Sequence, residues 1–338
     1  MKKATTEDVK NRSKEKPCIS IVMCTYNGEK YIREQLDSLL RQTLLPSEII
    51  IQDDCSTDNT CKIVMEYSLK HPFIKLFRNK QNKGINENFF SAIQKATCDY
   101  IAICDQDDIW EDYKLELQMK SIGGHLLCGG RSEAFSDTGA AIRNDLRCPN
   151  CHLLRQIFVG TMAGHTLFFK RELLEHIPAL NTFIHIRCYD AILLIVAGAL
   201  ESIIYLDKKL VNHRRYSEAA TYTAPTDNNK NIKNIWKSIV RTYNYNRKIK
   251  PEISRRLLDT KDFLKKITPQ TSTQKKAIRM IELYTGSRFI DFLKLELFCL
   301  KNYRYFFFAS SPHWLVGRIR ALYFPIQLSD YYRWLIKE

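Results

Sequence analysis

Hydrophobic and polar positions alternate in blocks along the first hundred residues. Four short β-branched runs, each ending in a polar or turn-forming segment, predict strands at 19–23, 48–52, 74–77 and 100–104. Apolar residues recur at helical spacing between them, over 29–42, about 58–70 and 86–96. Because each parallel crossover needs a helix to return the chain, this order predicts an α/β fold with a doubly wound, mostly parallel sheet.

Polar residues follow three of the predicted strands: Thr25, Tyr26 and Asn27 the first, Asp53 and Asp54 the second, and Asp105-Gln106-Asp107-Asp108 the fourth. Ligands of such sheets bind beyond the carboxyl ends of the strands, so we expect these segments to converge on one crevice. Clustered carboxylates suit a hard divalent cation held together with a substrate's phosphates. A glycine-rich dinucleotide motif and a P-loop are both absent from the sequence, which disfavours those enzyme classes.

Charge divides the 338 residues into two unequal parts. Residues 226–338 hold 23 basic and 9 acidic side chains, whereas the preceding 225 residues hold 29 basic and 28 acidic ones. We therefore expect a polar N-terminal tail over 1–17, a nearly neutral α/β domain over 18–225, and a basic, mainly helical extension over 226–338.

The basic extension implies an anionic partner, either a nucleic acid or an anionic membrane surface. Its aromatic residues, which include the segment 303–308 and Trp314, are interleaved with cations as in interfacial segments. This mixture favours an anionic membrane surface as the partner, and we expect no nucleic acid to bind. The alternative is that these rings form the core of a small helical bundle, and both interpretations can hold for different faces.

Targeting signals and cysteines bear on the compartment. Residues 1–16 lack an apolar signal segment, and the longest apolar run, 191–200, is about half of a bilayer span. We expect a cytoplasmic protein, peripheral at the inner face of the cell membrane, whose eleven cysteines are free thiols. The segment 148–152 (Cys-Pro-Asn-Cys-His) matches the haem-attachment pattern, but haem attachment normally needs export, and zinc would need a second ligand pair.

Four ordered motifs resemble the family 2 glycosyltransferases, in particular the bacterial branch with rhamnosyltransferases of surface-polysaccharide assembly. They are 19–42, 53–60 (Asp-Asp-Cys-Ser-Thr-Asp-Asn-Thr), 82–84 (Asn-Lys-Gly) and 105–110 (Asp-Gln-Asp-Asp-Ile-Trp). The likeness is strong over about 18–120, weaker to about 220 and absent beyond. It implies a GT-A fold and an inverting transfer from a nucleoside-diphosphate sugar, possibly dTDP-rhamnose or a UDP-sugar.

The resemblance also implies roles for residues at the predicted crevice. Tyr26 stacks on the nucleotide base in a pocket shaped by Thr25 and Asn27, or alternatively packs on its own helix. Asp54 accepts a hydrogen bond from the base. Asp105 lies near the ribose and diphosphate, and Asp107, with Asp105, ligates Mg²⁺ or Mn²⁺.

Downstream residues complete the implied site. Asp190, just before the apolar run, matches the family's catalytic base, with helix capping as its alternative role. The segment 213–216 (His-Arg-Arg-Tyr) matches a Y-R-x-H element with its end residues exchanged. It implies that Arg214 or Arg215 clamps the diphosphate and that His213 approaches the metal. Cys55 replaces the usual glycine of the second motif, and 160–165 looks like an acceptor-side loop.

The first hypothesis is thus an inverting, metal-dependent glycosyltransferase that acts on a lipid-linked or polysaccharide acceptor in capsule or O-antigen synthesis. A sugar-1-phosphate nucleotidyltransferase is an alternative on a similar sheet, although the glycine-rich loop of those enzymes is absent from the sequence. A non-enzymatic protein that binds anionic polymers through the basic extension is the third hypothesis.

Overall fold

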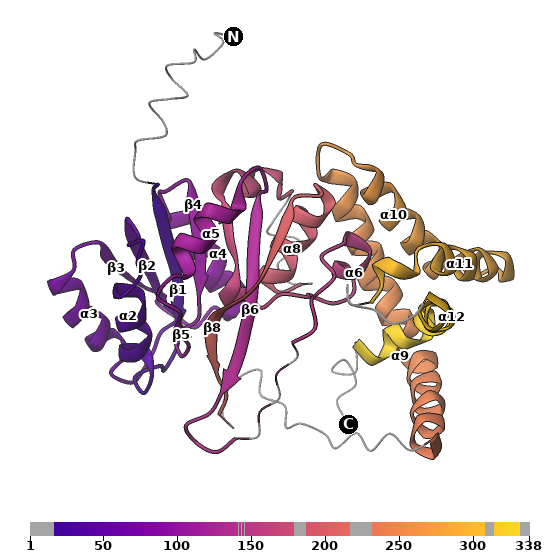
Figure 1. The fold of residues 1–338 in the computed structure, drawn as a ribbon, viewed down its shortest axis with the longest axis horizontal. Helices are drawn as coiled ribbons and strands as arrows, with labels where there is room; N and C mark the ends of the chain where they lie inside the picture. The colour runs from indigo at the N-terminus through magenta and orange to yellow at the C-terminus, as the bar shows by residue number, and fades with distance from the viewer. Residues whose placement is uncertain are drawn as a thin grey trace, which may run out of the picture.

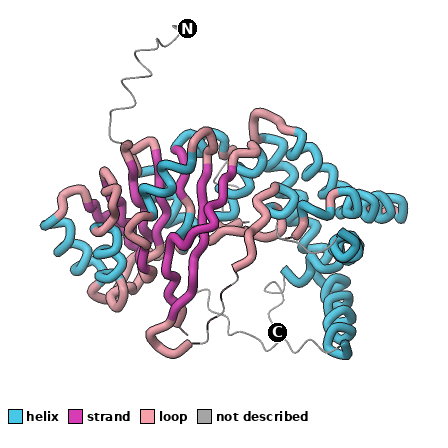
Figure 2. The backbone as a smooth tube through the Cα atoms, viewed as in Figure 1, coloured by secondary structure: helices cyan, strands magenta, loops and turns pink. Residues whose placement is uncertain are grey.

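The computed structural model describes residues 17–140, 142, 144, 146–178, 187–216, 232–307 and 314–331. A central sheet carries helices on both faces, and the C-terminal helices lie at one side of it (Figure 1). Figure 2 shows the strands as one continuous layer between these helices. The strands are β1 (Ile19–Thr25), β2 (Glu48–Asp53), β3 (Ile74–Arg78), β4 (Tyr100–Cys104), β5 (Ile109–Trp110), β6 (Leu127–Phe135), β7 (Phe168–Lys170) and β8 (Ile203–Arg214).

The eight strands are ordered β3-β2-β1-β4-β7-β6-β8-β5. Strands β1 to β4 are mutually parallel, as are β6 and β8, whereas β7 is antiparallel to β4 and β6 and β5 is antiparallel to β8. The prediction of a mostly parallel α/β sheet is confirmed. Strands β5 to β8 have no counterpart among the predicted strands, because β6 contains the helix- and strand-weakening pair Gly129-Gly130 and β7 is only 3 residues long.

Alternating side chains of the parallel strands pack on two helical layers. Ile21 and Met23 of β1 lie in a core with α2, α3 and α5, whereas Val22 faces a core with α4 and α8. The helices of this part are α2 (Ile32–Leu40), α3 (Thr60–Lys70), α4 (Ile85–Lys95), α5 (Lys114–Ile122), α6 (Leu153–Gln156), η1 (Gly164–Thr166), η2 (Arg171–His176) and α8 (Tyr189–Ala199).

The C-terminal region is helical, as predicted, with α9 (Ile232–Lys266), α10 (Ser272–Thr285), α11 (Phe289–Lys301), η3 (Tyr303–Tyr305) and α12 (Trp314–Tyr331). Buried Ile253, Met280 and Phe324 from these helices join the same core as Leu193 of α8. No helix in the described ranges is long and apolar enough to span a bilayer. The tail 1–16 and the predicted boundary at 225 lie outside the described residues.

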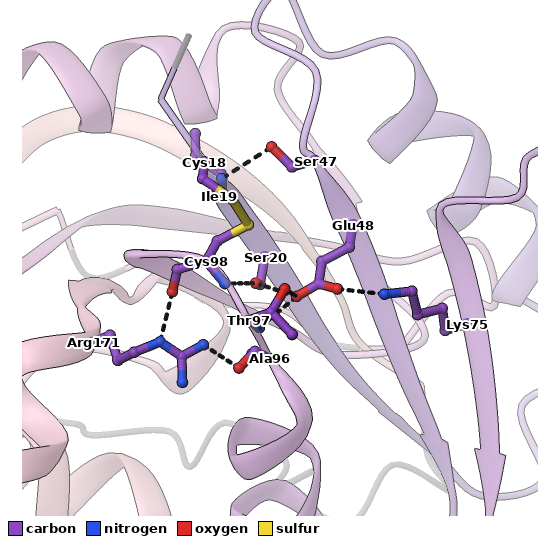
Figure 3. Close-up of a disulfide and its surroundings, with 10 residues drawn as sticks. All are labelled: Cys18, Ile19, Ser20, Ser47, Glu48, Lys75, Ala96, Thr97, Cys98 and Arg171. Atoms are coloured by element: carbon purple, nitrogen blue, oxygen red, sulfur yellow. Dashed lines mark hydrogen bonds and ion pairs between the residues drawn. A yellow bond between two sulfur atoms is a disulfide. The ribbon is translucent and has the colours of Figure 1, made fainter. Parts of the chain in front are cut away.

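Cys18 and Cys98 form a disulfide between the start of β1 and the residues just before β4 (Figure 3). The expectation of free thiols throughout is therefore wrong for this pair. Parallel pairing of β1 with β4 brings the two residues, 80 apart in sequence, to a Cα separation of 4.9 Å. The other nine cysteines are free.

Beside the disulfide, Glu48 anchors the amino-terminal edge of the sheet (Figure 3). Its Oε1 accepts hydrogen bonds from Ser20 Oγ (2.7 Å) and from the backbone N (2.6 Å) and Oγ1 (2.8 Å) of Thr97, and Lys75 Nζ lies 2.8 Å from its Oε2. Burial alone would raise the pKa of Glu48, but Lys75, Ser20 and Thr97 outweigh it and lower the pKa to about 2.

Candidate functional site

The carboxyl ends of β1 and β2 are tied together. Thr25 Oγ1 donates to Asp53 Oδ1 at 3.0 Å, and the backbone N of Asp54 donates to the Thr25 carbonyl at 2.8 Å. Asn27 joins the same corner, because its backbone N donates to Ser56 Oγ at 2.9 Å. The first two predicted segments thus meet at one edge of the sheet. Asp53 is fully buried in this contact, which gives it a structural role.

The third segment joins them through Gln106. The backbone N of Tyr26 donates to Gln106 Oε1 at 2.9 Å, and Gln106 Nε2 donates to the Tyr26 carbonyl at 3.0 Å. Gly28 makes room for this amide, since a Cβ there would overlap Gln106 Oε1. The pair fixes the backbone of Tyr26 and leaves its ring at the surface, 49% exposed. Gln106 is a positioning residue that motif reasoning missed, because it occupies the variable place of the D-x-D pattern.

Asp54 faces the loop that opens α4. Its Oδ1 accepts hydrogen bonds from Asn79 Nδ2 and the backbone N of Lys83, both at 2.8 Å, and its Oδ2 accepts from the backbone N of Gly84 at 2.9 Å. Gly84 has φ of 80°, which favours glycine. Asp54 therefore joins the sequence motif 53–60 to the motif 82–84. A nucleotide base that bonded to Asp54 would share the carboxylate of this residue with the loop 82–84.

Asp105 and Asp107 present crowded carboxylates beyond β4. Burial, followed by the negative charges of Asp108 and Asp105, raises the pKa of Asp107 to about 6. Tyr216 Oη donates to Asp107 Oδ2 at 2.7 Å. A divalent cation would relieve this crowding, and carboxylate oxygens are the ligands that Mg²⁺ and Mn²⁺ prefer. The residues at this edge therefore fit the metal that the sequence predicts.

Asp190 lies in the first turn of α8. Its Oδ1 accepts a hydrogen bond from the backbone N of Ala191 at 2.7 Å. The N-cap of α8 is Cys188, which makes no side-chain capping bond, so Asp190 does not have the alternative role of a helix cap. Burial and the negative charge of Asp105 raise the pKa of Asp190. A carboxylate with a raised pKa next to Asp105 is a stronger base than an exposed one. The preceding residues His185 and Ile186 lie outside the described residues.

Asn86 of α4 fastens the start of α8. Its Nδ2 donates to the Arg187 carbonyl and its Oδ1 accepts from the backbone N of Tyr189, both at 3.0 Å. The Tyr189 ring stacks on Phe89 at 3.9 Å between centroids, and Gly164 lies so close to its hydroxyl that a Cβ would overlap it. The helix that follows the 82–84 loop thus sets the position of Asp190. Sequence reasoning missed Asn86, because no motif links it to α8.

The two arginines after β8 differ in their surroundings. Arg214 is 2% exposed, its Nη2 lies 2.5 Å from Glu34 Oε2, and its Nη1 is paired with Asp137. It would have to leave both carboxylates to reach a diphosphate. Arg215 is half-buried, and its Nη1 lies 3.2 Å from His213 Nε2.

His213 lies beside Asp108 and His165. His165 Nδ1 is 3.2 Å from Asp108 Oδ2 and 3.2 Å from Asp105 Oδ2, and His213 Nδ1 is 3.3 Å from Asp108 Oδ1. Burial opposes protonation of His165, but Asp108 and Asp105 raise its pKa to about 8. Within the described ranges, Asp108, His165 and His213 are the one group of three such residues with ligand atoms close enough to hold a metal ion. Sequence reasoning placed His165 only in a loop, because it lies 57 positions after Asp108 in sequence and only the pairing of β7 with β4 brings them together.

Residues 20–178 match the family model described as glycosyl transferase family 2. This segment is a family 2 glycosyltransferase domain. Its three aspartates beyond β4 and its motif at 53–60 lie within the matched residues, and the mixed α/β fold is the GT-A fold that the resemblance implied.

Relatives of this family 2 domain include enzymes with named donors. The dTDP-rhamnosyl transferase RfbG of Shigella flexneri is 42% identical over 99 residues, which cover 28% of this chain and 34% of RfbG. The UDP-Glc:alpha-D-GlcNAc-diphosphoundecaprenol beta-1,3-glucosyltransferase WfgD of Escherichia coli is 40% identical over 101 residues, 30% of this chain and 39% of WfgD. An uncharacterized protein of Mycobacterium tuberculosis is 32% identical over 232 residues, 63% of each chain. The match therefore spans less than two thirds of these relatives.

A solved structure shares the fold over most of the chain. S. aureus TarS 1-349 in complex with UDP-GlcNAc superposes with a TM-score of 0.53 and 16% identity, covering 94% of this chain and 92% of that one. At this identity the likeness describes the fold alone.

Proposed function

We propose that this family 2 glycosyltransferase transfers a sugar, with inversion, from a nucleoside-diphosphate sugar to a lipid-linked or polysaccharide acceptor of a bacterial surface glycan. The observation that supports the proposal most strongly is the pair Asp105 and Asp107, which follows the carboxyl end of β4. Asp190 is near enough to Asp105 for the negative charge of Asp105 to raise the pKa of Asp190. Metal-bridging acids and a separate buried carboxylate are the two components that direct displacement needs.

The donor's nucleotide would lie against Tyr26. Its exposed ring can stack on a base while Gln106 holds the backbone, and Thr25 and Asn27 form the rigid corner below. Asp54 is already fixed by backbone donors and can accept one more hydrogen bond from a base N–H. The preformed geometry would lower the entropy cost of donor binding.

Asp105 and Asp107 would hold Mg²⁺ or Mn²⁺, and such an ion, when bound, stabilises negative charge on the leaving diphosphate. Tyr216 donates a hydrogen bond to Asp107 and keeps its carboxylate oriented. Arg215, and Arg214 if it leaves Glu34 and Asp137, would add positive charge for the diphosphate.

Asp190 would act as the base. The acceptor oxygen forms a bond to the anomeric carbon as the bond from that carbon to the diphosphate breaks, and the acceptor's proton moves to the Asp190 carboxylate. Attack from the face opposite the diphosphate inverts the configuration. The raised pKa of Asp190 makes this proton transfer more favourable than it would be for an exposed aspartate.

The named relatives guide the choice of donor and acceptor. RfbG is named for a dTDP-rhamnosyl donor, and WfgD for UDP-Glc and a diphosphoundecaprenol-linked acceptor. We therefore propose dTDP-rhamnose or a UDP-sugar as donor, and a polyprenyl-diphosphate-linked glycan of capsule or O-antigen synthesis as acceptor.

The C-terminal helices offer a surface for the membrane that carries such an acceptor. Apolar side chains of α11 and α12 are strongly exposed, among them Phe289 (74%), Ile319 (60%) and Trp314 (53%). Cations accompany them, and the Arg318 guanidinium lies 5.2 Å from the Trp314 ring centroid. Exposed apolar groups mixed with cations suit an anionic lipid surface, so we place the protein at the inner face of the cell membrane.

Replacement of one metal ligand tests the transfer reaction. Asp107→Asn should reduce sugar transfer from the accepted donor by at least roughly 100-fold, because one charged ligand is lost. Asp99→Asn, an exposed aspartate at the opposite edge, is the matched control. Turnover is measured as nucleoside diphosphate released after a screen of dTDP- and UDP-sugars with Mn²⁺. Near-normal turnover in Asp107→Asn would remove the metal role, and pyrophosphate as product would favour a nucleotidyltransferase.

Flotation with lipid vesicles tests the membrane surface. The double variant Phe289→Ser/Ile319→Ser should lose most of its association with phosphatidylglycerol vesicles, because two apolar contacts become polar. Leu69→Ser provides the control, since Leu69 is 86% exposed on α3, away from these helices. Equal flotation of all three proteins, or preferential retention on DNA, would contradict the proposal.

A further inference from the structure

A cavity lies beside the candidate active site, between β6 and the loop that precedes η1. It encloses about 250 Å³ and is lined by residues of β6, the segment 147–149, α6, the loop 159–163, η1 and β8. This volume is just below the range of roughly 300–1,000 Å³ that is typical of ligand sites, so the cavity suits one compact group. None of the residues assigned above to the donor, the metal or the base lines it.

The wall of this cavity is basic. Arg131, Arg147 and Arg155 line it, and the described residues of the lining include no aspartate or glutamate. Arg131 is paired with Glu133 (Nε to Oε1, 3.1 Å) and with Asp207 (Nη1 to Oδ1, 3.2 Å), and these two acids fix its side chain beside the cavity. Three guanidinium groups around a small volume favour an anionic ligand.

Hydroxyl groups complete the polar part of the lining, from Ser132, Thr161, Thr166 and Tyr205. Thr161 Oγ1 accepts a hydrogen bond from Gln156 Nε2 at 2.6 Å, so the hydrogen of this hydroxyl remains to be donated to a ligand oxygen. Burial, followed by the negative charge of Asp207, raises the pKa of Tyr205 to about 12, so its phenol stays protonated and can also donate. Guanidinium and hydroxyl donors together match the several oxygen atoms of a phosphate or diphosphate group.

One side of the cavity adjoins the elements that carry the proposed reacting carboxylates. Thr166, which lines the cavity, follows His165, and His165 Nδ1 lies 3.2 Å from Asp105 Oδ2. Gly160, also in the lining, lies against α8, because a Cβ added there would be in van der Waals contact with that helix. The first turn of α8 carries Asp190. A group in the cavity would therefore be held near the metal pair and the proposed base.

The other side of the cavity adjoins the C-terminal helices. Arg155 Nη1 donates to the Phe306 carbonyl at 2.8 Å, and the Phe306 ring stacks on Phe324 of α12 with centroids 4.4 Å apart. Asn150 Nδ2, in the segment before α6, donates to the Arg304 carbonyl of η3 at 2.8 Å. In Figure 1, α6 lies between β6 and the C-terminal helices. The cavity is thus placed between the proposed chemistry and the helices whose apolar side chains we assign to the membrane.

We propose that this cavity binds the diphosphate of a lipid-diphosphate-linked acceptor. The inference rests on the proposed function and adds the place where the acceptor is held. The donor's diphosphate would lie at Asp105 and Asp107, so a separate basic cavity supplies charge for the diphosphate of the acceptor. The sugar end of the acceptor would leave the cavity towards Asp190, and its lipid chain would leave towards α12.

Calorimetric titration of the full-length protein with farnesyl diphosphate tests the proposal in EDTA, without donor or sugar transfer. EDTA removes divalent cations, so Asp105 and Asp107 repel the diphosphate of the probe. We expect one molecule bound per chain, and an affinity that falls by roughly 10-fold or more in Arg147→Gln and in Arg155→Gln, because each loses a charge-assisted hydrogen bond. Arg33→Gln, an exposed arginine of α2, is the matched control and should bind as the parent does.

Companion probes separate the sources of the affinity. Farnesol, which has the chain without the diphosphate, should bind much more weakly and equally well to the parent and to Arg147→Gln. Inorganic pyrophosphate should compete with farnesyl diphosphate, whereas methyl glucuronide should not, because it offers a single carboxylate. Arg215→Gln should bind farnesyl diphosphate as the parent does, since Arg215 belongs to the proposed donor site.

Four results would overturn the proposal. They are no binding of farnesyl diphosphate by the parent, parental affinity in Arg147→Gln, equal affinity for farnesol, and loss of binding in Arg215→Gln, which would assign the probe to the donor site. Displacement of the probe by methyl glucuronide would assign the cavity to an acidic sugar instead. Circular dichroism checks the fold of each variant, and exposed Arg147 decides the outcome if Arg155→Gln does not fold.

Failure of this inference and failure of the proposed function are separate results. A chain that binds farnesyl diphosphate through Arg147 but transfers no sugar contradicts only the proposed function. A chain that transfers sugar but does not bind the probe contradicts only the assignment of the cavity.

Discussion

The two edges of the parallel strands use buried carboxylates in opposite ways. At the amino-terminal edge, Glu48 has a hydrogen-bond or ion-pair partner for each oxygen, and its pKa falls to about 2. At the carboxyl-terminal edge, Asp107 and Asp190 lie near other acids, and their pKa values are raised. The first arrangement stabilises the fold, whereas the second gathers negative charge that a bound cation would compensate further. Predictions that change one carboxylate at a time test this contrast.

The largest expected effect belongs to Asp190. Asp190→Asn should lower the turnover number of sugar transfer by roughly 10²–10⁴-fold, because the amide cannot accept the acceptor's proton. The free energy of unfolding should stay the same or rise, since a buried charge near Asp105 is removed. Steady-state kinetics and urea unfolding measure the two quantities. A variant that keeps its turnover but loses stability would reverse the assignment of this edge.

Glu48→Gln should show the opposite behaviour. We expect a loss of about 2–4 kcal/mol in the free energy of unfolding, because Lys75 loses its partner and buried donors lose a charged acceptor. Turnover measured well below the melting temperature should equal that of the parent. If Glu48→Gln unfolds at the parent's urea concentration, the network around Glu48 contributes little to stability.

Acid should weaken the same network. The folded pKa of Glu48, about 2, is below its ordinary value of 4.5, so its contribution is complete above about pH 4.5 and is lost as the pH falls towards 2. This contribution is worth ~3 kcal/mol at neutral pH. Urea unfolding of the parent and of Glu48→Gln between pH 7 and pH 3 measures it, and the two curves should converge on acidification. Parallel curves would contradict the low pKa.

The smallest expected effect concerns the backbone at the site edge. Cys55 has φ of 69°, a left-handed conformation that costs non-glycine residues about 1–2 kcal/mol. Cys55→Gly should raise the melting temperature by about 1–3 °C, after subtraction of the extra entropy of glycine in the unfolded chain. Cys55→Ala, which keeps the Cβ, should give no such rise. A lower melting temperature for Cys55→Gly would show that this turn is not strained.

Local sequence patterns predict the strands β1 to β4 and the acids that follow them well, because each signal lies within a few consecutive residues. The convergence of Thr25, Asp53 and Asp105 follows from parallel pairing alone. The same reasoning fails for β7, whose three residues enter the sheet antiparallel between β4 and β6. It also fails for the disulfide, since nothing near Cys18 or Cys98 in sequence shows that the two strand starts adjoin.

Long-range contacts of individual side chains limit the prediction of the site. The sequence offers Arg214 for a diphosphate, yet its pairing with Glu34 and Asp137 depends on how β8 passes α2 and the segment after β6. Likewise, the surroundings of His165 depend on β7, and the two bonds of Asn86 depend on the placement of α8. Residue type indicates which groups can react, but tertiary packing decides which of them are available.

In the proposed mechanism, the two hydrogen bonds of Asn86 connect the residues of donor recognition with the residue of proton removal. The loop 82–84 is bonded to Asp54, and α4, which begins directly after that loop, holds the backbone on both sides of Cys188, two residues before Asp190. If the proposed roles hold, a shift of the loop 82–84 when a nucleotide enters would therefore move Asp190 as well. Such a linkage provides a route by which an occupied donor pocket aligns Asp190 before the acceptor arrives, and so limits hydrolysis of the sugar nucleotide by water.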